Sequence, residues 1–451
     1  MWENKGHRPY WAFLHIQALS TPFENLTGFL YQKQLFLINE HAVNSAYLDT
    51  TEMKFATAYF EKFWKDKEKR NQFLNAVQNY FRQAEKIVTE FSTLDLKKLS
   101  EQEILSQMEK AVNVHGFSFL LVTNPQHVAP LEMELNALLE KKENKEKILS
   151  SITRNNLPLP FDEEHQEIKN YRKIWTTISF NQQQKILQTL TQKYGWIGGI
   201  EGETPYGNEH YEREILSTQE KREEIPLIKM ETEILELGNL IALLSNQRIW
   251  SRWHGMRLRY CIKLGVQELA TRWNFPLIEY ATIPEMQEYS HTKKINFQEL
   301  EKRKKEGYVA TIINGKPILL TGEKAAIYTE LVEEQIEHTD SVQGRCANPG
   351  KIIGKVRIIS FASEEYHKEI SEFQNGEILV TGMTRPQIAH LCHKASAIIT
   401  DEGGITSHAS IISREFNIPC IIATKNATKI FKTGDIIEVD AITGIARKIN
   451  K

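Results

Sequence analysis

The hydrophobic pattern of this chain changes its period near residue 308, and that change constrains the fold more than any other feature. Up to about residue 280, apolar side chains recur at every third or fourth position, which places them on one face of an amphipathic helix. The clearest run comprises Val77, Tyr80, Phe81, Ala84, Ile87, Val88 and Phe91. From residue 344 onward, short apolar runs alternate with helical segments instead. The pattern predicts a mainly helical region followed by a compact α/β unit.

Two capping boxes mark helix starts in the first region. Ser100 precedes Glu103 by three positions, and Thr282 precedes Glu285 in the same way. In such a pair the hydroxyl and the carboxylate each accept a hydrogen bond from a backbone amide that the helix leaves unpaired. We therefore expect one helix to begin after Ser100 and another after Thr282.

A hairpin and one more helix close the helical region. Residues 308–320 contain two short apolar runs around Asn314-Gly315, which is typical of a tight hairpin turn. A helix is expected over 323–337, and the polar segment 338–342 is interpreted as a linker.

The chain is thus predicted to contain two parts, 1–340 and 341–451. In the second part, strands are expected at 355–360, 377–381, 396–400, 420–424, 436–440 and 445–448, and helices at 386–394 and 407–416.

The composition is that of an ordinary soluble protein. Apolar residues make up 41% of the 451 residues and charged residues 25%, which excludes a wholly disordered chain. The net charge of -2 predicts no general attraction to nucleic acid or to an anionic membrane. The first residues have no apolar signal core, and no apolar run approaches the roughly 18 residues that span a bilayer. A cytoplasmic location is therefore expected.

One segment places a histidine after a glycine pair at the start of a predicted helix. Residues 400–415 read Thr-Asp-Glu-Gly-Gly-Ile-Thr-Ser-His-Ala-Ser-Ile-Ile-Ser-Arg-Glu, and Gly403, Gly404 and His408 lie at the centre. Glycines allow a close backbone approach, and a helix N-terminus favours an anion. A neutral imidazole can take phosphate as a covalent intermediate. The segment suits a histidine that carries a phosphoryl group, although a helix-terminal histidine held by backbone hydrogen bonds is the alternative.

This segment resembles the phosphohistidine motif of the phosphoenolpyruvate-utilising enzymes. The resemblance continues upstream through Gly344–Val356 and Glu377–Thr381, and downstream through Asn417–Cys420 to Gly444, over about 110 residues. It implies that 341–451 form the swivelling β/β/α domain of that family, which carries phosphohistidine between two distant sites.

The resemblance assigns roles to residues around His408. It makes His408 the catalytic phosphocarrier and implies that Gly403 and Gly404 support the phosphate site. Thr406 and Ser407 are N-caps by default, and the resemblance adds that Thr406 can be a regulatory phosphorylation site.

Further along the same predicted helix, Arg414 is expected either to meet phosphate or to pair with a carboxylate.

The same family loads its histidine from ATP in an ATP-grasp domain. We find no G-x-x-x-x-G-K-[ST] loop and no ATP-grasp pattern in 1–340, and a barrel of about 250 residues cannot follow His408. The order of helical region and histidine domain resembles the part of rifampicin phosphotransferase that follows its ATP-binding domain. ATP and Mg²⁺ are therefore expected on a separate ATP-grasp partner, and no metal site is predicted in this chain.

The resemblance also implies an acceptor pocket in the helical region. Arg248 and Arg252 share a helical face next to His254, so their guanidinium groups could surround phosphate or an anionic substrate. The alternative is an exposed basic face opposite the acidic run 231–236.

A glycine-rich loop offers candidates for a general base. Residues 194–206 contain Glu201 and Glu203, and His210 follows. Each could deprotonate an acceptor hydroxyl, although an ordinary structural loop is the favoured interpretation for each residue taken alone. Related antibiotic kinases have a histidine within this loop, whereas this sequence has none before His210.

Two functions remain open. The first is a dikinase-type phosphotransferase component in which His408 moves phosphate from ATP on another subunit to a small-molecule acceptor. The second is a non-catalytic phosphocarrier or regulatory binding protein with the same domain. The acceptor is not specified by the sequence, since function resides in the pocket rather than in the fold.

Overall fold

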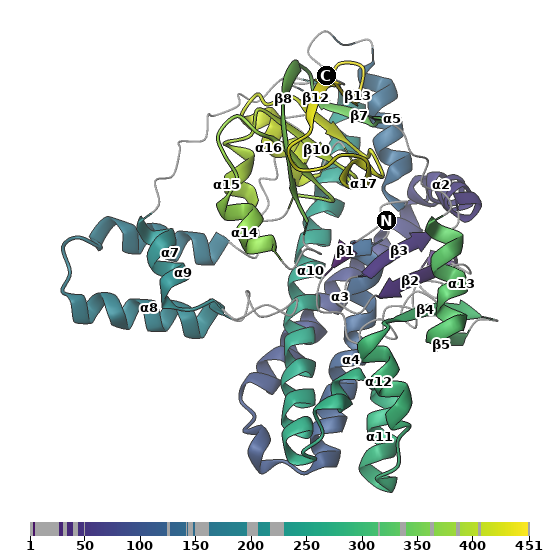
Figure 1. The fold of residues 1–451 in the computed structure, drawn as a ribbon, viewed down its shortest axis with the longest axis vertical. Coiled ribbons are helices and arrows are strands. Elements are labelled where there is room, and N and C mark those ends of the chain that lie inside the picture. The colour runs from purple at the N-terminus through teal and green to yellow at the C-terminus, as the bar shows by residue number, and fades with distance from the viewer. Residues whose placement is uncertain are drawn as a thin grey trace.

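The computed structural model describes most of the chain and shows a mostly helical N-terminal region beside a C-terminal sheet region (Figure 1). The described residues are 3–4, 27–29, 34–38, 44–48, 50–123, 127–140, 142, 148, 162–195, 206–216, 230–313, 316–333, 340–360, 365–384, 388–404 and 407–449. Among these residues, no helix combines the length and the apolar character needed to cross a membrane.

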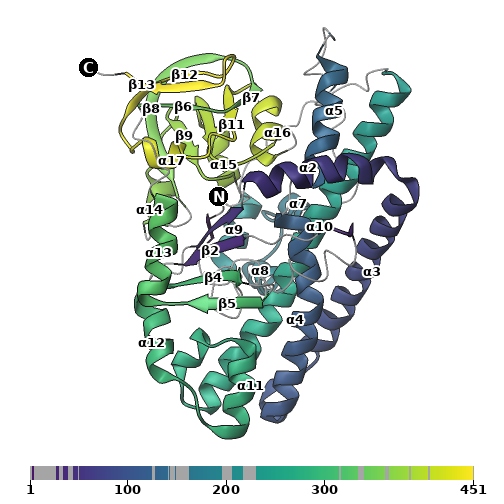
Figure 2. The same ribbon diagram turned by 90° about the vertical axis from the view of Figure 1, so that its right-hand side faces the viewer.

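Five helices build the main helical core. They are α2 (Thr50–Lys65), α3 (Lys67–Ser92), α4 (Glu101–Thr123), α5 (Ala129–Leu139) and α10 (Thr232–Arg272). Helix α10 has 41 residues, so it is about 60 Å long, and it extends along much of the longest axis of the molecule (Figures 1 and 2). It packs mainly against α4 and α3.

The predicted apolar stripe of α3 is confirmed. The helix buries the side chains of Phe73, Val77, Tyr80, Ala84, Val88 and Phe91. The capping box before α4 is confirmed as well, because Glu103 N donates to Ser100 Oγ at 3.2 Å and Ser100 N donates to Glu103 Oε2 at 2.7 Å.

The chain continues from α10 through short helices into a hairpin. These elements are η4 (Pro276–Tyr280), α11 (Ile283–Thr292), α12 (Phe297–Lys305), β4 (Tyr308–Ile313), β5 (Lys316–Leu320) and α13 (Gly322–Glu333). Thr282 and Glu285 form the predicted capping box of α11, and Arg303 of α12 bonds to Glu285 at 2.8 and 2.9 Å. The predicted hairpin strands pair antiparallel, whereas the Asn314-Gly315 turn lies outside the described residues.

The hairpin belongs to a larger sheet that the sequence did not predict. Strands β1 (Glu3–Asn4), β2 (Gln34–Ile38) and β3 (Asn44–Leu48) join it in the order β1-β3-β2-β4-β5. Strand β2 pairs with β4 across a wide gap in the sequence, with Leu37 opposite Val309. A short apolar run cannot be assigned to a strand from its period alone, since its partner lies far away along the chain.

A second helical group, the three-helix unit, stands apart from the main core (Figure 1). It consists of α7 (Asp162–Ile174), α8 (Phe180–Tyr194) and α9 (Asn208–Leu216). Its own apolar core contains Ile168, Trp175, Leu187, Leu190, Tyr194, Tyr211 and Ile215. Within this core, the buried carboxyl of Glu164 accepts a hydrogen bond from the Tyr211 hydroxyl at 3.3 Å.

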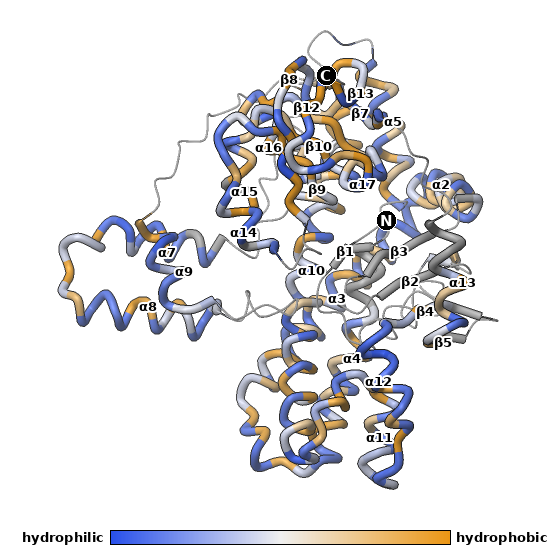
Figure 3. Tube along the Cα trace, in the orientation of Figure 1, coloured by the Kyte–Doolittle hydropathy of each residue, from blue (hydrophilic) through white to orange (hydrophobic). Residues whose placement is uncertain are grey.

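The C-terminal region contains a sheet of eight strands in the order β6-β13-β12-β8-β9-β10-β11-β7. The strands are β6 (Ser341–Gln343), β7 (Arg345–Asn348), β8 (Lys351–Ile359), β9 (Ile378–Thr381), β10 (Ala397–Thr400), β11 (Cys420–Ile422), β12 (Ile436–Asp440) and β13 (Ile445–Lys448). Strands β8 to β11 pair in parallel, and their apolar side chains contribute to two separate cores. Hydrophobic residues are frequent in this region of the chain (Figure 3). The six predicted strands are therefore present.

Two details of this region differ from the prediction. The expected linker 338–342 ends inside β6, where Val342 is buried against the sheet. The expected helix 386–394 is shorter, since α15 covers Ala389–Cys392. Helices α14 (Tyr366–Ser371), α16 (His408–Glu415) and α17 (Ala427–Ile430) complete the region.

Candidate active site

His408 is the first residue of α16, directly after the loop that leaves β10. Ser407 caps the helix, and its side chain accepts a hydrogen bond from Ser410 N at 3.4 Å. The buried Ser410 hydroxyl donates to the Gly404 carbonyl at 2.8 Å and so ties the glycine loop to the helix. The imidazole thus lies at a helix N-terminus, where backbone amides and the helix dipole favour an anion.

Thr384 orients the imidazole of His408. Its buried hydroxyl Oγ1 lies 3.0 Å from Nδ1 of His408. When Nδ1 carries the proton and donates it to Thr384, the nucleophilic lone pair is on Nε2. The contact therefore selects which ring nitrogen can accept a phosphoryl group.

The surroundings keep this histidine neutral. His408 is exposed as a residue, yet desolvation of its ring by the surrounding protein, together with the positive charge of Arg252, lowers its pKa to about 4. The imidazole is consequently uncharged at pH 7 and available as a nucleophile.

The loop before His408 is fixed by a buried carboxylate. Asp401 Oδ1 accepts hydrogen bonds from Thr424 Oγ1 at 3.1 Å and from Thr428 N at 3.2 Å. Burial raises the pKa of Asp401, and these hydrogen bonds oppose that shift. The backbone amides of Asp401 and Glu402 donate to Thr381 and Gly382 at 3.2 and 3.0 Å, which links this loop to the segment that carries Thr384.

Sequence reasoning missed both Thr384 and Asp401. The available signal was their position, because Asp401 directly follows one predicted strand and Thr384 comes three residues after another, and the ends of neighbouring parallel strands meet at one edge of a sheet.

Gly403 and Gly404 are each restricted to glycine for a different structural reason. Gly403 has a φ of +127°, and a Cβ there would lie 2.9 Å from Ser407 Oγ, so the turn itself requires glycine. A Cβ on Gly404 would instead lie 3.1 Å from the Glu132 carboxylate of α5. Gly404 thus permits close approach to the helical region, rather than to the imidazole.

Two further residues were predicted to support the phosphate site, Arg414 and Thr406. Arg414 Nε donates to the Ala347 carbonyl of β7 at 3.1 Å, so one part of this guanidinium group holds α16 on the sheet. Thr406 lies outside the described residues.

Helix α10 brings positive charge to His408. Arg252 acts electrostatically on the imidazole, and Arg248 is one helical turn away on the same face. Surrounding atoms lower the pKa of Arg248, and the carboxylates of Glu132 and Glu402 oppose that shift. The two predicted arginines are therefore close enough to interact electrostatically with His408 and with the carboxylates of Glu132 and Glu402, and Figure 2 shows α16 near α5.

His254 belongs to the core of the helical region. Its buried ring stacks on Trp250 at 5.7 Å and lies 5.2 Å from the Phe81 ring. Burial lowers its pKa to about 4, and Glu85 opposes this shift with Nδ1 3.8 Å from a carboxylate oxygen. These contacts indicate a packing role for His254.

His210, one of the predicted general bases, is not grouped with the arginines. His210 lies in α9 of the three-helix unit, where its ring stacks on Tyr206 at 3.8 Å and burial lowers its pKa to about 4. Glu201 and Glu203 lie outside the described residues. In the described part of the chain, no three His, Cys, Asp or Glu side chains form a metal-binding group.

Comparison with known proteins identifies the segment around His408. Residues 373–444 match the family model of the PEP-utilising enzyme, mobile domain. This match confirms the resemblance that the sequence of 400–415 indicated.

Two curated relatives match part of the chain. A probable phosphoenolpyruvate synthase of Pyrococcus horikoshii is 44% identical over 137 residues, which are 30% of this chain and 16% of that protein. The uncharacterized phosphotransferase YvkC of Bacillus subtilis is 36% identical over 159 residues, which are 35% of this chain and 18% of that protein. The similarity therefore spans less than a fifth of either relative.

Among solved structures, the solution structure of Enzyme I (nEIt) is 12% identical and covers 78% of this chain and 82% of its own. Its TM-score of 0.22 is too low to support an argument about the fold.

Proposed function

We propose, on the premise that residues 373–444 are a mobile domain of the phosphoenolpyruvate-utilising enzymes, that His408 carries a phosphoryl group between a nucleotide and an acceptor. The observation that supports this most is the neutral, partly exposed imidazole at the start of α16, with Nδ1 held 3.0 Å from the Thr384 hydroxyl.

The proposed reaction has two transfers. In the first, the Nε2 lone pair of His408 attacks a phosphorus atom of the donor, a P–N bond forms, and the donor P–O bond breaks. The ring then carries positive charge, which Thr384 stabilises by accepting the hydrogen bond from Nδ1–H. In the second transfer, an acceptor oxygen attacks phosphorus, the P–N bond breaks, and a base takes the acceptor proton.

The helix N-terminus and Arg252 supply the electrostatic part of this chemistry. Both bring positive potential to the place where the phosphoryl oxygens would gather. Arg248 and Arg252 are accordingly the acceptor-side residues of this proposal, whereas the packing of His254 argues against a direct role.

The donor and the acceptor complete the proposal. In this proposal, ATP with Mg²⁺ is bound by a separate ATP-grasp protein, which supplies the phosphoryl group to His408. The acceptor is a small molecule that meets phospho-His408 at the arginine face of α10.

The test is phosphoryl transfer in a reconstituted pair. The full chain, an ATP-grasp protein that serves as phosphoryl donor and γ- or β-labelled ATP should yield one label on this chain that acid removes and base preserves. His408→Ala should abolish the label. His291→Ala, an exposed histidine at the end of α11, is the matched control and should be labelled normally. Full labelling of a folded His408→Ala chain would exclude the proposal.

A further inference from the structure

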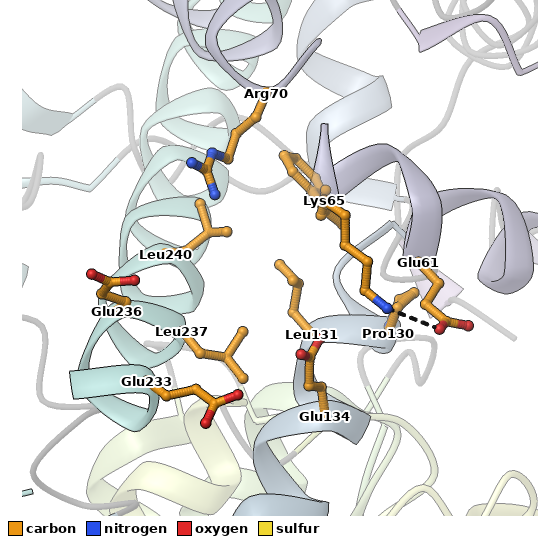
Figure 4. A pocket seen from close by; sticks show the side chains of 11 residues that line it. Glu61, Lys65, Arg70, Pro130, Leu131, Glu134, Glu233, Glu236, Leu237 and Leu240 are labelled. Carbon is orange, nitrogen blue, oxygen red and sulfur yellow. Dashed lines mark hydrogen bonds and ion pairs between the residues drawn. The ribbon is translucent and has the colours of Figure 1, made fainter. Parts of the chain in front are cut away.

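A pocket of about 200 Å³ opens in the helical region between α2, α3, α5 and α10 (Figure 4). Nothing in the phosphoryl-transfer proposal uses it. The residues that line it form an apolar middle with charged groups at opposite ends, and this distribution restricts the kind of ligand that the pocket can bind.

The middle of the pocket is apolar. Leu237 and Leu240, three positions apart on α10, face Leu131 of α5 across the opening (Figure 4). A ligand with an aliphatic or aromatic body would cover these side chains and remove their surface from water.

The two ends carry opposite charges. Arg70 of α3 extends into one end, and Glu134 of α5 and Glu233 of α10 lie at the other (Figure 4). Glu236 of α10 also lines the pocket and adds a second carboxylate from that helix. Lys65 also lines the pocket, but its Nζ is 3.3 Å from Glu61 Oε1, so these two charges compensate each other.

The charges at the ends have no such partners. Within the described ranges, Arg70, Glu134 and Glu233 make no ion pair. They lie on three different helices, so the opposition of charge depends on the tertiary fold rather than on neighbours along one helix.

We propose that this bipolar pocket, defined by Arg70, Leu131, Glu134, Glu233 and Leu237, binds a small zwitterionic molecule with an apolar body. Its acidic group pairs with Arg70, and its ammonium group pairs with the two carboxylates. An anion alone would meet the carboxylates unpaired, and a cation alone would leave Arg70 without a counterion, so a molecule with both charges fits best.

The bipolar pocket and the His408 loop lie on different sides of α5. Glu134 and Leu131 line the pocket, whereas the Glu132 carboxylate would lie 3.1 Å from a Cβ on Gly404 of the histidine loop. One residue advances about 100° around a helix, so Glu132 points away from the pocket side. The proposed ligand site is therefore distinct from the phosphoryl-transfer site.

Calorimetric titration of the full chain with three matched probes tests the proposal. 6-Aminohexanoate has both charges, hexanoate has only the acid, and hexylammonium has only the amine. We expect 6-aminohexanoate to bind at least about tenfold more tightly than either single-charge probe, since each charge-assisted contact is worth roughly a factor of ten or more.

Variants assign the two ends. Arg70→Gln should weaken 6-aminohexanoate binding about tenfold, and so should the double change Glu134→Gln with Glu233→Gln. Arg70→Lys keeps the positive charge and should retain most of the wild-type affinity. Glu68→Gln, an exposed change on α3 outside the pocket lining, should have no effect. Equal affinity for the three probes, absence of binding, or insensitivity to Arg70→Gln in a folded chain would overturn the proposal.

Discussion

Replacing Thr384 with valine should slow the phosphorylation of His408 without unfolding the domain. Valine keeps nearly the same shape in this buried position but removes the hydroxyl that lies 3.0 Å from Nδ1. A hydrogen bond to a charged group contributes about 1.5–3 kcal/mol. Because His408 is an exposed residue, water can partly replace the hydroxyl, which favours the lower end of that range. Since about 1.4 kcal/mol corresponds to a tenfold change in rate, we expect labelling to be about tenfold slower.

The assay is single-turnover labelling of the full chain by the ATP-grasp partner, followed by quenching in base. Thr443→Val, an exposed threonine of the same region, is the control and should be labelled at the wild-type rate. A Thr384→Val chain that melts like the wild type and is labelled equally fast would refute the positioning role of Thr384.

Three further predictions follow from the structure. Gly403→Ala should destabilise the C-terminal region by about 1–2 kcal/mol in thermal melts, because alanine is strained at a φ of +127°. Gly382→Ala is the control and should show no comparable loss, because a Cβ there has no neighbour within 4 Å. Burial raises the pKa of Glu164 to about 7, so the folded three-helix unit holds this proton more tightly than the unfolded chain does. The free energy of unfolding of the unit should therefore fall by about 3 kcal/mol as the pH rises from about 4.5 to above 7. Hydrogen exchange should detect this fall in the wild type and not in Glu164→Gln. Arg252→Gln should raise the pKa of His408 in an NMR titration, since a nearby positive charge is removed, and an unchanged pKa would show that Arg252 does not act on the ring.

The sequence predicted the local elements well. The apolar stripe of α3 and the capping box at Ser100 depend on residues close together in the chain, so their patterns could be read directly. The strands around His408 could also be predicted in a second way, because the order of the motifs around them resembles that of a known family.

Contacts between residues far apart in the chain could not be predicted from the sequence. Strand β2 becomes identifiable only when Leu37 is seen opposite Val309 in the sheet. The role of Thr384 likewise depends on how two strand ends meet, because 24 positions separate it from His408. Gly404 was predicted to support the phosphate site, whereas the neighbour nearest to a Cβ there is Glu132 in the other part of the chain.

Localising the phosphoryl group tests the central claim most directly. The chain labelled by its ATP-grasp partner should be digested at basic pH and analysed by tandem mass spectrometry, with phosphorus NMR to identify the bonded nitrogen. We predict a single acid-labile phosphoryl group on Nε2 of His408, the nitrogen opposite the one that contacts Thr384. An acid-stable ester on Thr406 or Ser407, or a label on any residue other than His408, would contradict the account.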